Sequence, residues 1–187
     1  MIKEKLRAEL LTRRRKLKKH IVLEKSKKIE QKLFSTNEFK QAFTIMFYVS
    51  YDNEVFTHEM IKKCLKENKK IVLPVVNKEK NNLILSELIS WHDLENGAYN
   101  ILEIRKDCII EIATDKIDLI IVPGVGFDLK GNRIGHGKGY YDKLLKKSKA
   151  KKIGLAFEWQ ILDKIPIETH DIPLKKIITE KRIINCL

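Results

Sequence analysis

Apolar residues along the chain fall into two alternating patterns, short continuous runs and longer stretches with helical spacing. The runs at 43–50, 71–76 and 117–122 are rich in β-branched and aromatic residues, as expected for strands that are covered on both faces. Apolar positions recur every three or four residues at 55–66 and 140–148, which predicts amphipathic helices. Strands that alternate with helices indicate a largely parallel sheet with helices on both of its faces.

The first 34 residues predict two helices with a break near Lys19 and His20, because one apolar stripe continues through both of them. The basic residues at positions 3, 7 and 13–15 are typical of a solvated helix face. Lys3 and Arg7 nevertheless lie four residues apart on one face of one turn, where both can reach a single anion.

Four further stretches complete the predicted sheet and its connections. Residues 83–88 alternate as an outer strand would, and 90–116 are irregular enough to predict a loop region with short elements. Residues 152–157 and 176–179 predict the last two strands. The sequence therefore predicts an α/β fold: a single three-layer, Rossmann-like domain over residues 1–187, with a largely parallel or mixed central sheet and helices on both faces.

Composition narrows the class of protein. Apolar content is 43%, which is ordinary for a globular protein, and no apolar run approaches the roughly 20 residues that a membrane span needs. The first residues are charged from Lys3 onward, unlike a secretory signal, so we expect a cytoplasmic protein with no membrane partner. We also expect a monomer. Cys64, Cys108 and Cys186 lack the spacing of metal ligands, which predicts reduced thiols and no zinc site.

The formal net charge of +13 raises the hypothesis of a basic nucleotide- or RNA-binding module. However, 31 of the 38 basic residues are lysines, and they are spread along the whole chain. Most aromatic residues fall in strands that look buried, whereas an RNA-binding surface interleaves exposed aromatic and basic residues. Basic residues also suit anionic small molecules, so this module remains an alternative and no dedicated nucleic-acid partner is expected.

The stretch 123–142 carries the strongest chemical signal. It holds most of the chain's eight glycines, and three of them alternate with a histidine and a lysine. The stretch follows a predicted strand and opens a predicted helix. This arrangement gathers backbone N–H groups, a lysine and a helix N-terminus around one point, as a phosphate group requires. Its spacing matches neither the Walker A loop nor the dinucleotide-binding fingerprint.

A purely structural interpretation of this stretch is a tight turn in which the glycines only supply positive φ. Three alternating glycines beside Arg133 and Lys138 exceed what such a turn needs. Asp142 falls in the first turn of the following helix, where the helix dipole favours a carboxylate. The same position suits a ligand for a magnesium ion that rides on the phosphates.

The full pattern of this stretch is Pro-Gly-Val-Gly-Phe-Asp followed by G-x-R-x-G-x-G-x-G-Y-Y-D. It resembles the hallmark motif of the 5-formyltetrahydrofolate cyclo-ligase family, whose members are also called methenyltetrahydrofolate synthetases. Four further blocks, at 3–13, 48–57, 73–74 and 154–180, resemble the family in the right order and extend the likeness over nearly the whole chain. One departure is Glu103, which is followed by isoleucine where the family often has proline, so the middle substrate loop stays open.

The resemblance implies an enzyme, a ligase of one-carbon metabolism that forms a C–N bond. Its reaction converts 5-formyltetrahydrofolate and ATP into 5,10-methenyltetrahydrofolate, ADP and phosphate, with Mg²⁺ as cofactor and an iminium phosphate as intermediate. Such chemistry needs positioning and charge neutralisation more than a protein nucleophile. The implied partners are ATP and the folate, with or without a polyglutamate tail. A related ATP-dependent ligase that acts on another substrate is the second alternative, because the glycine-rich loop contacts only phosphates and does not identify the other substrate.

The resemblance also implies roles for individual residues. Arg133 and Lys138 are the expected catalytic cations, and Asp142 and Asp171 are the expected magnesium ligands. The expected ATP-binding residues are Lys3, Arg7, Arg133, Gly135, His136, Gly137, Lys138, Gly139, Tyr140 and Tyr141. The expected substrate-binding residues are Tyr48, Val49, Glu54, Phe127, Tyr140 and Tyr141. Among the latter, Glu54 would bind the pterin ring through paired hydrogen bonds.

Overall fold

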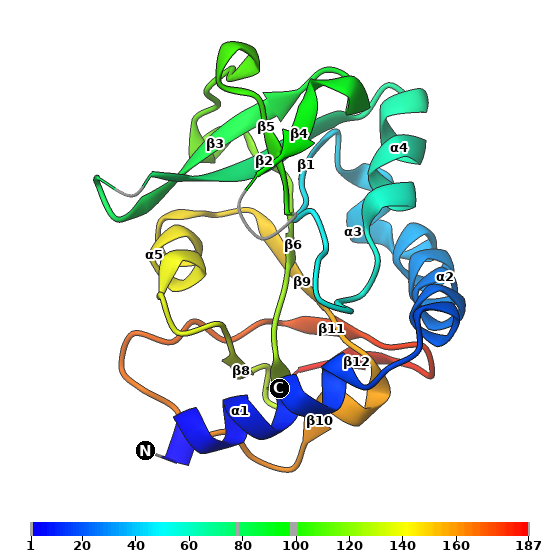
Figure 1. Cartoon of the computed structure of the whole chain (residues 1–187), viewed down its shortest axis with the longest axis vertical. Coiled ribbons are helices and arrows are strands. Elements are labelled where there is room, and N and C mark those ends of the chain that lie inside the picture. The colour runs from blue at the N-terminus through cyan, green and yellow to red at the C-terminus, as the bar shows by residue number, and fades with distance from the viewer. Residues whose placement is uncertain (1, 78, 98–100, 187) are drawn as a thin grey trace.

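The computed structural model describes residues 2–77, 79–97 and 101–186, and its centre is a seven-stranded sheet. The strands are β1 (Thr44–Met46), β2 (Lys70–Asn77), β3 (Asn82–Leu88), β6 (Leu119–Val122), β9 (Lys151–Leu155), β11 (Lys176–Ile178) and β12 (Ile183–Asn185). Their order across the sheet is β12–β11–β9–β6–β1–β2–β3 (Figure 1). The five inner strands are parallel, and β3 and β12 join the two edges antiparallel. The sheet is therefore mixed, and the predicted three-layer α/β fold is confirmed.

Helices cover both faces of the sheet. They are α1 (Ile2–Arg15), α2 (Lys19–Ser35), α3 (Asn37–Gln41), α4 (His58–Lys66) and α5 (Tyr140–Lys147). Helices α2, α3 and α4 lie on one side and α5 on the other, while α1 crosses below the sheet (Figure 1). Strand residues alternate between the two cores: Ile45 and Phe47 pack with α2 and α4, whereas Met46 packs with α5. None of the helices in the described ranges is long and apolar enough to cross a membrane.

The sequence predicted most of these elements, and the differences include the end of one strand and a missed last strand. The predicted strand at 43–50 ends at Met46, with one further backbone bond from Phe47 N to Val72 O, and side-chain hydrogen bonds hold the chain beyond it. The Thr57 hydroxyl donates to Tyr48 O at 2.6 Å and accepts from Ser50 N at 3.1 Å. The prediction that 176–179 is the last strand is wrong, since β12 follows it. That strand is only three residues long and buries only Ile184, so its periodicity is too short to recognise.

The region 90–116 contains short elements, as predicted, although residues 98–100 lie outside the described residues. The elements are η1 (Trp91–Asp93), β4 (Leu94–Asn96), β5 (Leu102–Ile104), η3 (Lys106–Cys108) and η4 (Thr114–Lys116). A three-stranded sheet was not predicted. It consists of β7 (Gly126–Asp128), β8 (Arg133–Ile134) and β10 (Ile161–Leu162), and it holds the two arms of the glycine-rich stretch together.

The order of the parallel strands creates a place for a ligand. In chain order, β1, β2, β6, β9 and β11 are arranged 2-1-3-4-5 across the sheet. The direction of winding therefore reverses between β1 and β6. The chain diverges beyond the carboxyl ends of two such strands, and ligands of open α/β sheets bind in that crevice. Residues 47–57 leave β1 at this point, and the glycine-rich residues 123–139 leave β6.

Candidate active site

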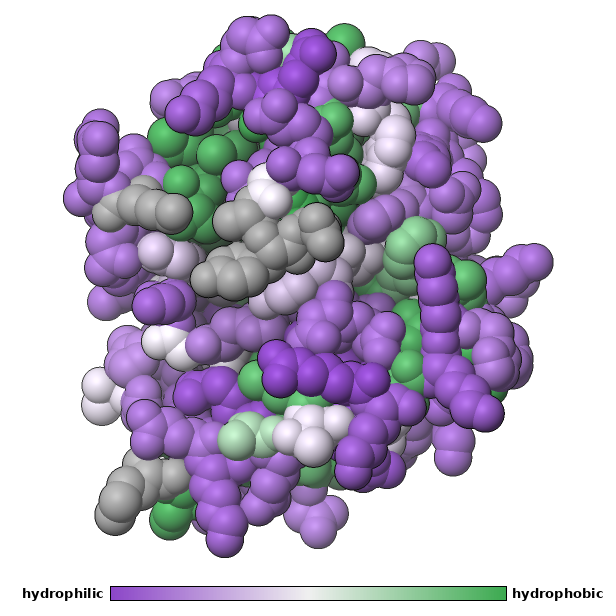
Figure 2. Space-filling model, in the orientation of Figure 1, coloured by the Kyte–Doolittle hydropathy of each residue, from purple (hydrophilic) through white to green (hydrophobic). Residues whose placement is uncertain are grey.

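A cleft of about 970 Å³ opens at this crevice. Its lining includes every residue nominated from the sequence except Phe127: Lys3, Arg7, Tyr48, Val49, Glu54, Arg133, Gly135, His136, Gly137, Lys138, Gly139, Tyr140, Tyr141, Asp142 and Asp171. The surface changes character across the molecule, with exposed hydrophobic residues over β2 and β3 and a mostly hydrophilic face over α1 (Figure 2). One apolar wall of the cleft is formed by Leu73, Pro74, Val76 and Leu83. The cleft therefore combines a charged end with an apolar wall.

Helix α1 docks its cations on the glycine-rich loop. The Arg7 Nε atom donates to Gly135 O at 2.7 Å. Gly137 has φ of +94°, a conformation that favours glycine, and a Cβ there would lie in van der Waals contact with the Arg7 guanidinium, 3.4 Å from its Cζ. Gly139 has φ of +68° and is the residue from which α5 begins. Lys138 lies exposed between these glycines and makes no hydrogen bond or ion pair with any residue in the described ranges.

A second cation of α1 reaches the loop before β11. Lys3 Nζ lies 2.6 Å from Asp171 Oδ2 and 3.6 Å from Glu168 Oε2, and His170 Nε2 lies 3.2 Å from the same Glu168 atom. Partial burial works to raise the pKa of Asp171. Hydrogen bonds from Lys3 and from Glu168 N outweigh burial and hold that pKa below its usual value. The ligand atoms of Glu168, His170 and Asp171 all lie within 4.8 Å of one another.

The other predicted metal ligand, Asp142, is held separately. Arg133 Nη2 lies 2.6 Å from Asp142 Oδ1, and the Arg133 side chain is 5% exposed. The guanidinium also lies over the ring of Tyr141, with 5.8 Å between Arg133 Cζ and the ring centroid. Each predicted magnesium ligand is thus a carboxyl group that is paired with a cation of the same cleft.

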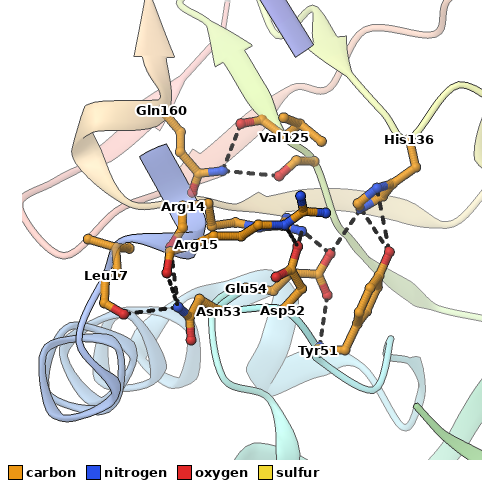
Figure 3. Close-up of polar contacts among 11 residues, drawn as sticks. Arg14, Arg15, Leu17, Tyr51, Asp52, Asn53, Glu54, Val125, His136 and Gln160 are labelled. Carbon is orange, nitrogen blue, oxygen red and sulfur yellow. Dashed lines mark hydrogen bonds and ion pairs between the residues drawn. The ribbon is translucent and has the colours of Figure 1, made fainter. Parts of the chain in front are cut away.

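The opposite side of the cleft centres on Glu54, which is only 7% exposed. Its Oε1 atom lies 3.4 Å from Arg14 Nη1 and 3.3 Å from His136 Nε2, and its Oε2 atom accepts from Tyr51 N at 3.2 Å (Figure 3). His136 was predicted to bind ATP, and the structure places its ring across the cleft against Glu54 and Tyr51. The glycine-rich loop, predicted to bind ATP, therefore contacts Glu54, the carboxylate predicted to bind the folate.

A tight turn sets the position of Glu54. Asp52 and Asn53 adopt positive φ values of 44° and 58°, a conformation that short polar side chains tolerate. The Asn53 amide donates to Leu17 O at 2.9 Å and to Arg14 O at 3.3 Å, so the turn also satisfies carbonyls at the end of α1. The turn and the helix are thereby fixed relative to each other.

Two tyrosines of the cleft differ in how their hydroxyls are satisfied. Tyr48 donates to Val55 O at 3.1 Å. The buried Tyr141 hydroxyl has no hydrogen-bond partner among the described residues. Burial, and after it the charge of Glu54, raises the pKa of both tyrosines, so both hydroxyls stay protonated at neutral pH. Tyr141 consequently offers an unused donor to a ligand.

Comparison with known proteins decides the family. The model of the 5-formyltetrahydrofolate cyclo-ligase family matches residues 1–180. The chain belongs to the 5-formyltetrahydrofolate cyclo-ligase family. A mouse 5-formyltetrahydrofolate cyclo-ligase is 33% identical over 189 residues, which cover 95% of this chain and 93% of the mouse protein. The Haemophilus influenzae 5-formyltetrahydrofolate cyclo-ligase is 28% identical over 92% of this chain and 96% of its own length.

Solved structures agree with this family. A 5,10-methenyltetrahydrofolate synthetase from Aquifex aeolicus superposes with a TM-score of 0.87 at 34% identity, covering 99% of this chain and 93% of that one. A 5,10-methenyltetrahydrofolate synthetase from Mycoplasma pneumoniae superposes with a TM-score of 0.78 at 27% identity, covering 96% and 99% of the two chains. The predicted family, fold and enzyme class are confirmed.

Two interpretations of this cyclo-ligase family chain need correction. Phe127 was predicted to contact substrate, but its side chain is fully buried beneath Gly124 and Gly154 and supports the loop from below. Arg14 was placed on a solvated helix face, yet it is 0% exposed. Its position four residues after the buried Leu10, on the same face of α1, was the signal available in the sequence.

Other lining residues of the cyclo-ligase cleft were missed. They include Tyr51, Leu73, Pro74, Leu83 and the segment 101–104. The apolar ones lie on β2, β3, β5 or beside it, where an apolar run gives the same signal whether it faces the core or a ligand. The sequence offered no means to separate these two cases.

Proposed function

We propose that the protein catalyses the ATP- and Mg²⁺-dependent cyclisation of 5-formyltetrahydrofolate to 5,10-methenyltetrahydrofolate, with release of ADP and phosphate. The observation that carries the proposal is the composition of one cleft. Its loop and helix side presents Lys3, Arg7 and Lys138, and its opposite side presents the buried Glu54 carboxylate. Both sides rise from one sheet, which supports a single domain over residues 1–187, and a monomer is part of the proposal.

The cationic side suits the triphosphate of ATP. The N–H groups of Gly135, Gly137 and Gly139 precede the N-terminus of α5, where the helix dipole favours negative charge. Lys138 is free to contact a phosphate, and Arg7 is already docked on the loop. Lys138 and Arg133 are proposed to neutralise charge as it develops on the transferred group. Lys3, Tyr140 and Tyr141 complete the proposed ATP contacts, together with His136.

Asp142 and Asp171 are proposed to hold Mg²⁺, directly or through water. Carboxylate oxygens are the ligands that Mg²⁺ prefers, so the residues present fit the ion. When bound, the ion would neutralise the charge of the phosphates. Arg133 and Lys3, which now pair with these two carboxylates, would then be released toward phosphate oxygens.

The other side suits a pterin. The Glu54 carboxylate can accept two parallel N–H bonds from such a ring, and the unused Tyr141 hydroxyl offers one more polar contact. Tyr48, Val49 and Tyr140 are proposed to line the ring, with the apolar residues of β2 and β3 opposite. Phe127 is left out of this proposal because it is buried.

In the proposed reaction the formyl oxygen attacks the γ-phosphorus, and the bond from that phosphorus to the bridging oxygen of ADP breaks. N10 of the folate then attacks the activated carbon, and the C–O bond breaks as phosphate leaves. The N10 proton is released to solvent. The protein contributes by holding the formyl oxygen and the γ-phosphate in line and by neutralising charge.

An absorbance assay tests the proposal. Purified protein is mixed with Mg-ATP and 5-formyltetrahydrofolate, and the ultraviolet absorbance of the methenyl product is followed. We expect a rise that requires both ATP and Mg²⁺, with omission of ATP and addition of EDTA as controls. Folded protein that gives no ATP-dependent rise would overturn the proposal. Release of ADP without any dependence on folate would instead favour a ligase for another substrate.

A further inference from the structure

We propose that Arg14 is a positioning residue for the folate, because it anchors the Glu54 carboxylate that faces the cleft. This inference rests on the proposed function. Arg14 is not among the residues that line the cleft, and it is 0% exposed. It therefore acts through Glu54 and not by touching a ligand.

The guanidinium of Arg14 bridges two carboxylates. Its Nη1 atom lies 3.4 Å from Glu54 Oε1, and its Nη2 atom lies 3.2 Å from Asp52 Oδ2 (Figure 3). The side-chain exposure of Arg14 is 1%, and that of Glu54 is 6%. A buried charge is tolerated only where it is paired, so removing the guanidinium would leave Glu54 buried without its fixed counter-charge. The planar fork of arginine also sets the direction of each carboxylate, which a point charge cannot do.

Arg14 is the fixed member among the groups that hold Glu54. His136 shares the Oε1 atom with Arg14, but its side chain is 34% exposed and belongs to the glycine-rich loop. Tyr51 N holds the other oxygen. A ligand that enters the cleft can displace the imidazole, whereas the guanidinium lies in the protein interior. Glu54 would therefore keep its position on Arg14 when its second partner changes from His136 to the pterin.

The backbone around Arg14 is held by the same turn that carries Glu54. Asn53 donates its side-chain amide to Arg14 O and Leu17 O, so the end of α1 is tied to the residue before Glu54. Arg14 is thus placed by its main chain as well as by its side chain. The distance from Arg14 to Glu54 is set before any substrate arrives.

A double-mutant cycle tests this role. The variants are Arg14→Met, Glu54→Gln and the double variant, with kcat and the KM of each substrate measured for all of them. We expect Arg14→Met to raise the folate KM by about tenfold or more, the loss that removal of a charged hydrogen bond produces. The ATP KM should change less than about twofold, because the effect passes through Glu54. In the Glu54→Gln background, Arg14→Met should raise the folate KM no further.

Arg15→Met is the matched control. Arg15 belongs to the same helix and lies 3.2 Å from the same Asp52 oxygen, but its side chain is 65% exposed and it does not contact Glu54. It should leave the folate KM within about twofold of wild type. Arg14→Lys keeps a buried cation that reaches only one carboxylate, so it should give an intermediate folate KM. Thermal unfolding reports which variants are folded.

Additive effects of Arg14→Met and Glu54→Gln, or an equal rise in the KM of both substrates, would overturn the proposal. If Arg14→Met does not fold, the same cycle with Arg14→Lys decides by the same criterion. Wild-type activity is measured first. Its absence would overturn the proposed function and this inference with it, whereas an active wild type with additive variants would overturn the role of Arg14 alone.

Discussion

Lys3 Nζ lies 2.6 Å from Asp171 Oδ2 and joins the first helix to a residue 168 positions further along the chain. Both side chains are mostly buried, at 14% and 13% exposure. Burial works to raise the pKa of Asp171, and the hydrogen bonds from Lys3 and Glu168 N lower it further than burial raises it. The ionised pair therefore stabilises the folded protein and closes one end of the cleft.

The stability of this pair should depend on pH. The folded pKa of Asp171 is below its unfolded value of about 4, so the contribution is complete above that value and is lost as pH falls through the folded pKa. We expect Lys3→Met to be less stable than wild type at pH 7, with the difference shrinking below about pH 4. Urea unfolding at several pH values measures it. Lys5→Met, an exposed change on the same helix, is the control, and a difference that stays constant with pH would contradict the expectation.

The two sides of the cleft should separate kinetically. Lys138→Ala removes a proposed phosphate contact and should chiefly raise the ATP KM. Glu54→Gln removes the proposed pterin acceptor and should chiefly raise the folate KM. Each rise should be about tenfold or more, as for loss of a charged hydrogen bond. Steady-state kinetics with each substrate varied in turn measure both, and Lys149→Ala, an exposed lysine beyond α5, is the control. Variants that leave both KM values unchanged would refute these assignments.

Two glycines of the loop should respond differently to alanine. Both have positive φ, so Gly137→Ala and Gly139→Ala should each lower the free energy of unfolding by about 1 kcal/mol. A Cβ at Gly139 meets open space, whereas a Cβ at Gly137 meets the guanidinium of Arg7. The strained backbone at Gly137 would relax against Arg7, so Gly137→Ala should also raise the ATP KM more than Gly139→Ala does. A larger rise in Gly139→Ala would show that the contact with Arg7 is unimportant.

Removal of two tyrosine hydroxyls should have opposite effects on stability. The Tyr141 hydroxyl is buried without a partner among the described residues, so Tyr141→Phe should stabilise the ligand-free protein by about 1 kcal/mol while raising a substrate KM. The Tyr48 hydroxyl donates to Val55 O, so Tyr48→Phe should destabilise the protein by about 1 kcal/mol. Thermal unfolding compares the two variants. If Tyr141→Phe were destabilising, its hydroxyl must already be satisfied in the free protein.

Local patterns were sufficient for most of the fold. The strands β2 and β6 and the helix α5 have runs or periodicity long enough to recognise without any tertiary information. The edge position of β3 followed from its alternation, and the structure pairs it on one side with β2. The glycine-rich loop was recognisable because its backbone adopts positive φ values that favour glycine, so the requirement is visible in the sequence itself.

The remaining features depend on contacts between residues distant in sequence. The helical spacing from Leu10 is the one local sign that Arg14 is buried and Arg15 is not, but the partners of Arg14 lie in the turn at Asp52 and Asn53, 38 or more residues away. In the sequence, Phe127 is indistinguishable from an aromatic residue of an exposed loop. It is buried because β10 pairs with β7 in the folded protein. The contact of His136 with Glu54 likewise requires two segments 82 residues apart to meet. Such pairings cannot be obtained from periodicity.

The docking of α1 has a consequence for how the protein is made. The partners of this helix include Glu54, Val125, Ile134, Ile165 and Asp171, all of which are translated later than the helix itself. During synthesis, residues 2–15 therefore leave the ribosome before each of these partners. A nascent chain that stops before about residue 171 lacks Asp171 and the strands β11 and β12, so it can complete neither the sheet nor the docking of α1. Completion of the cleft is a late event of folding.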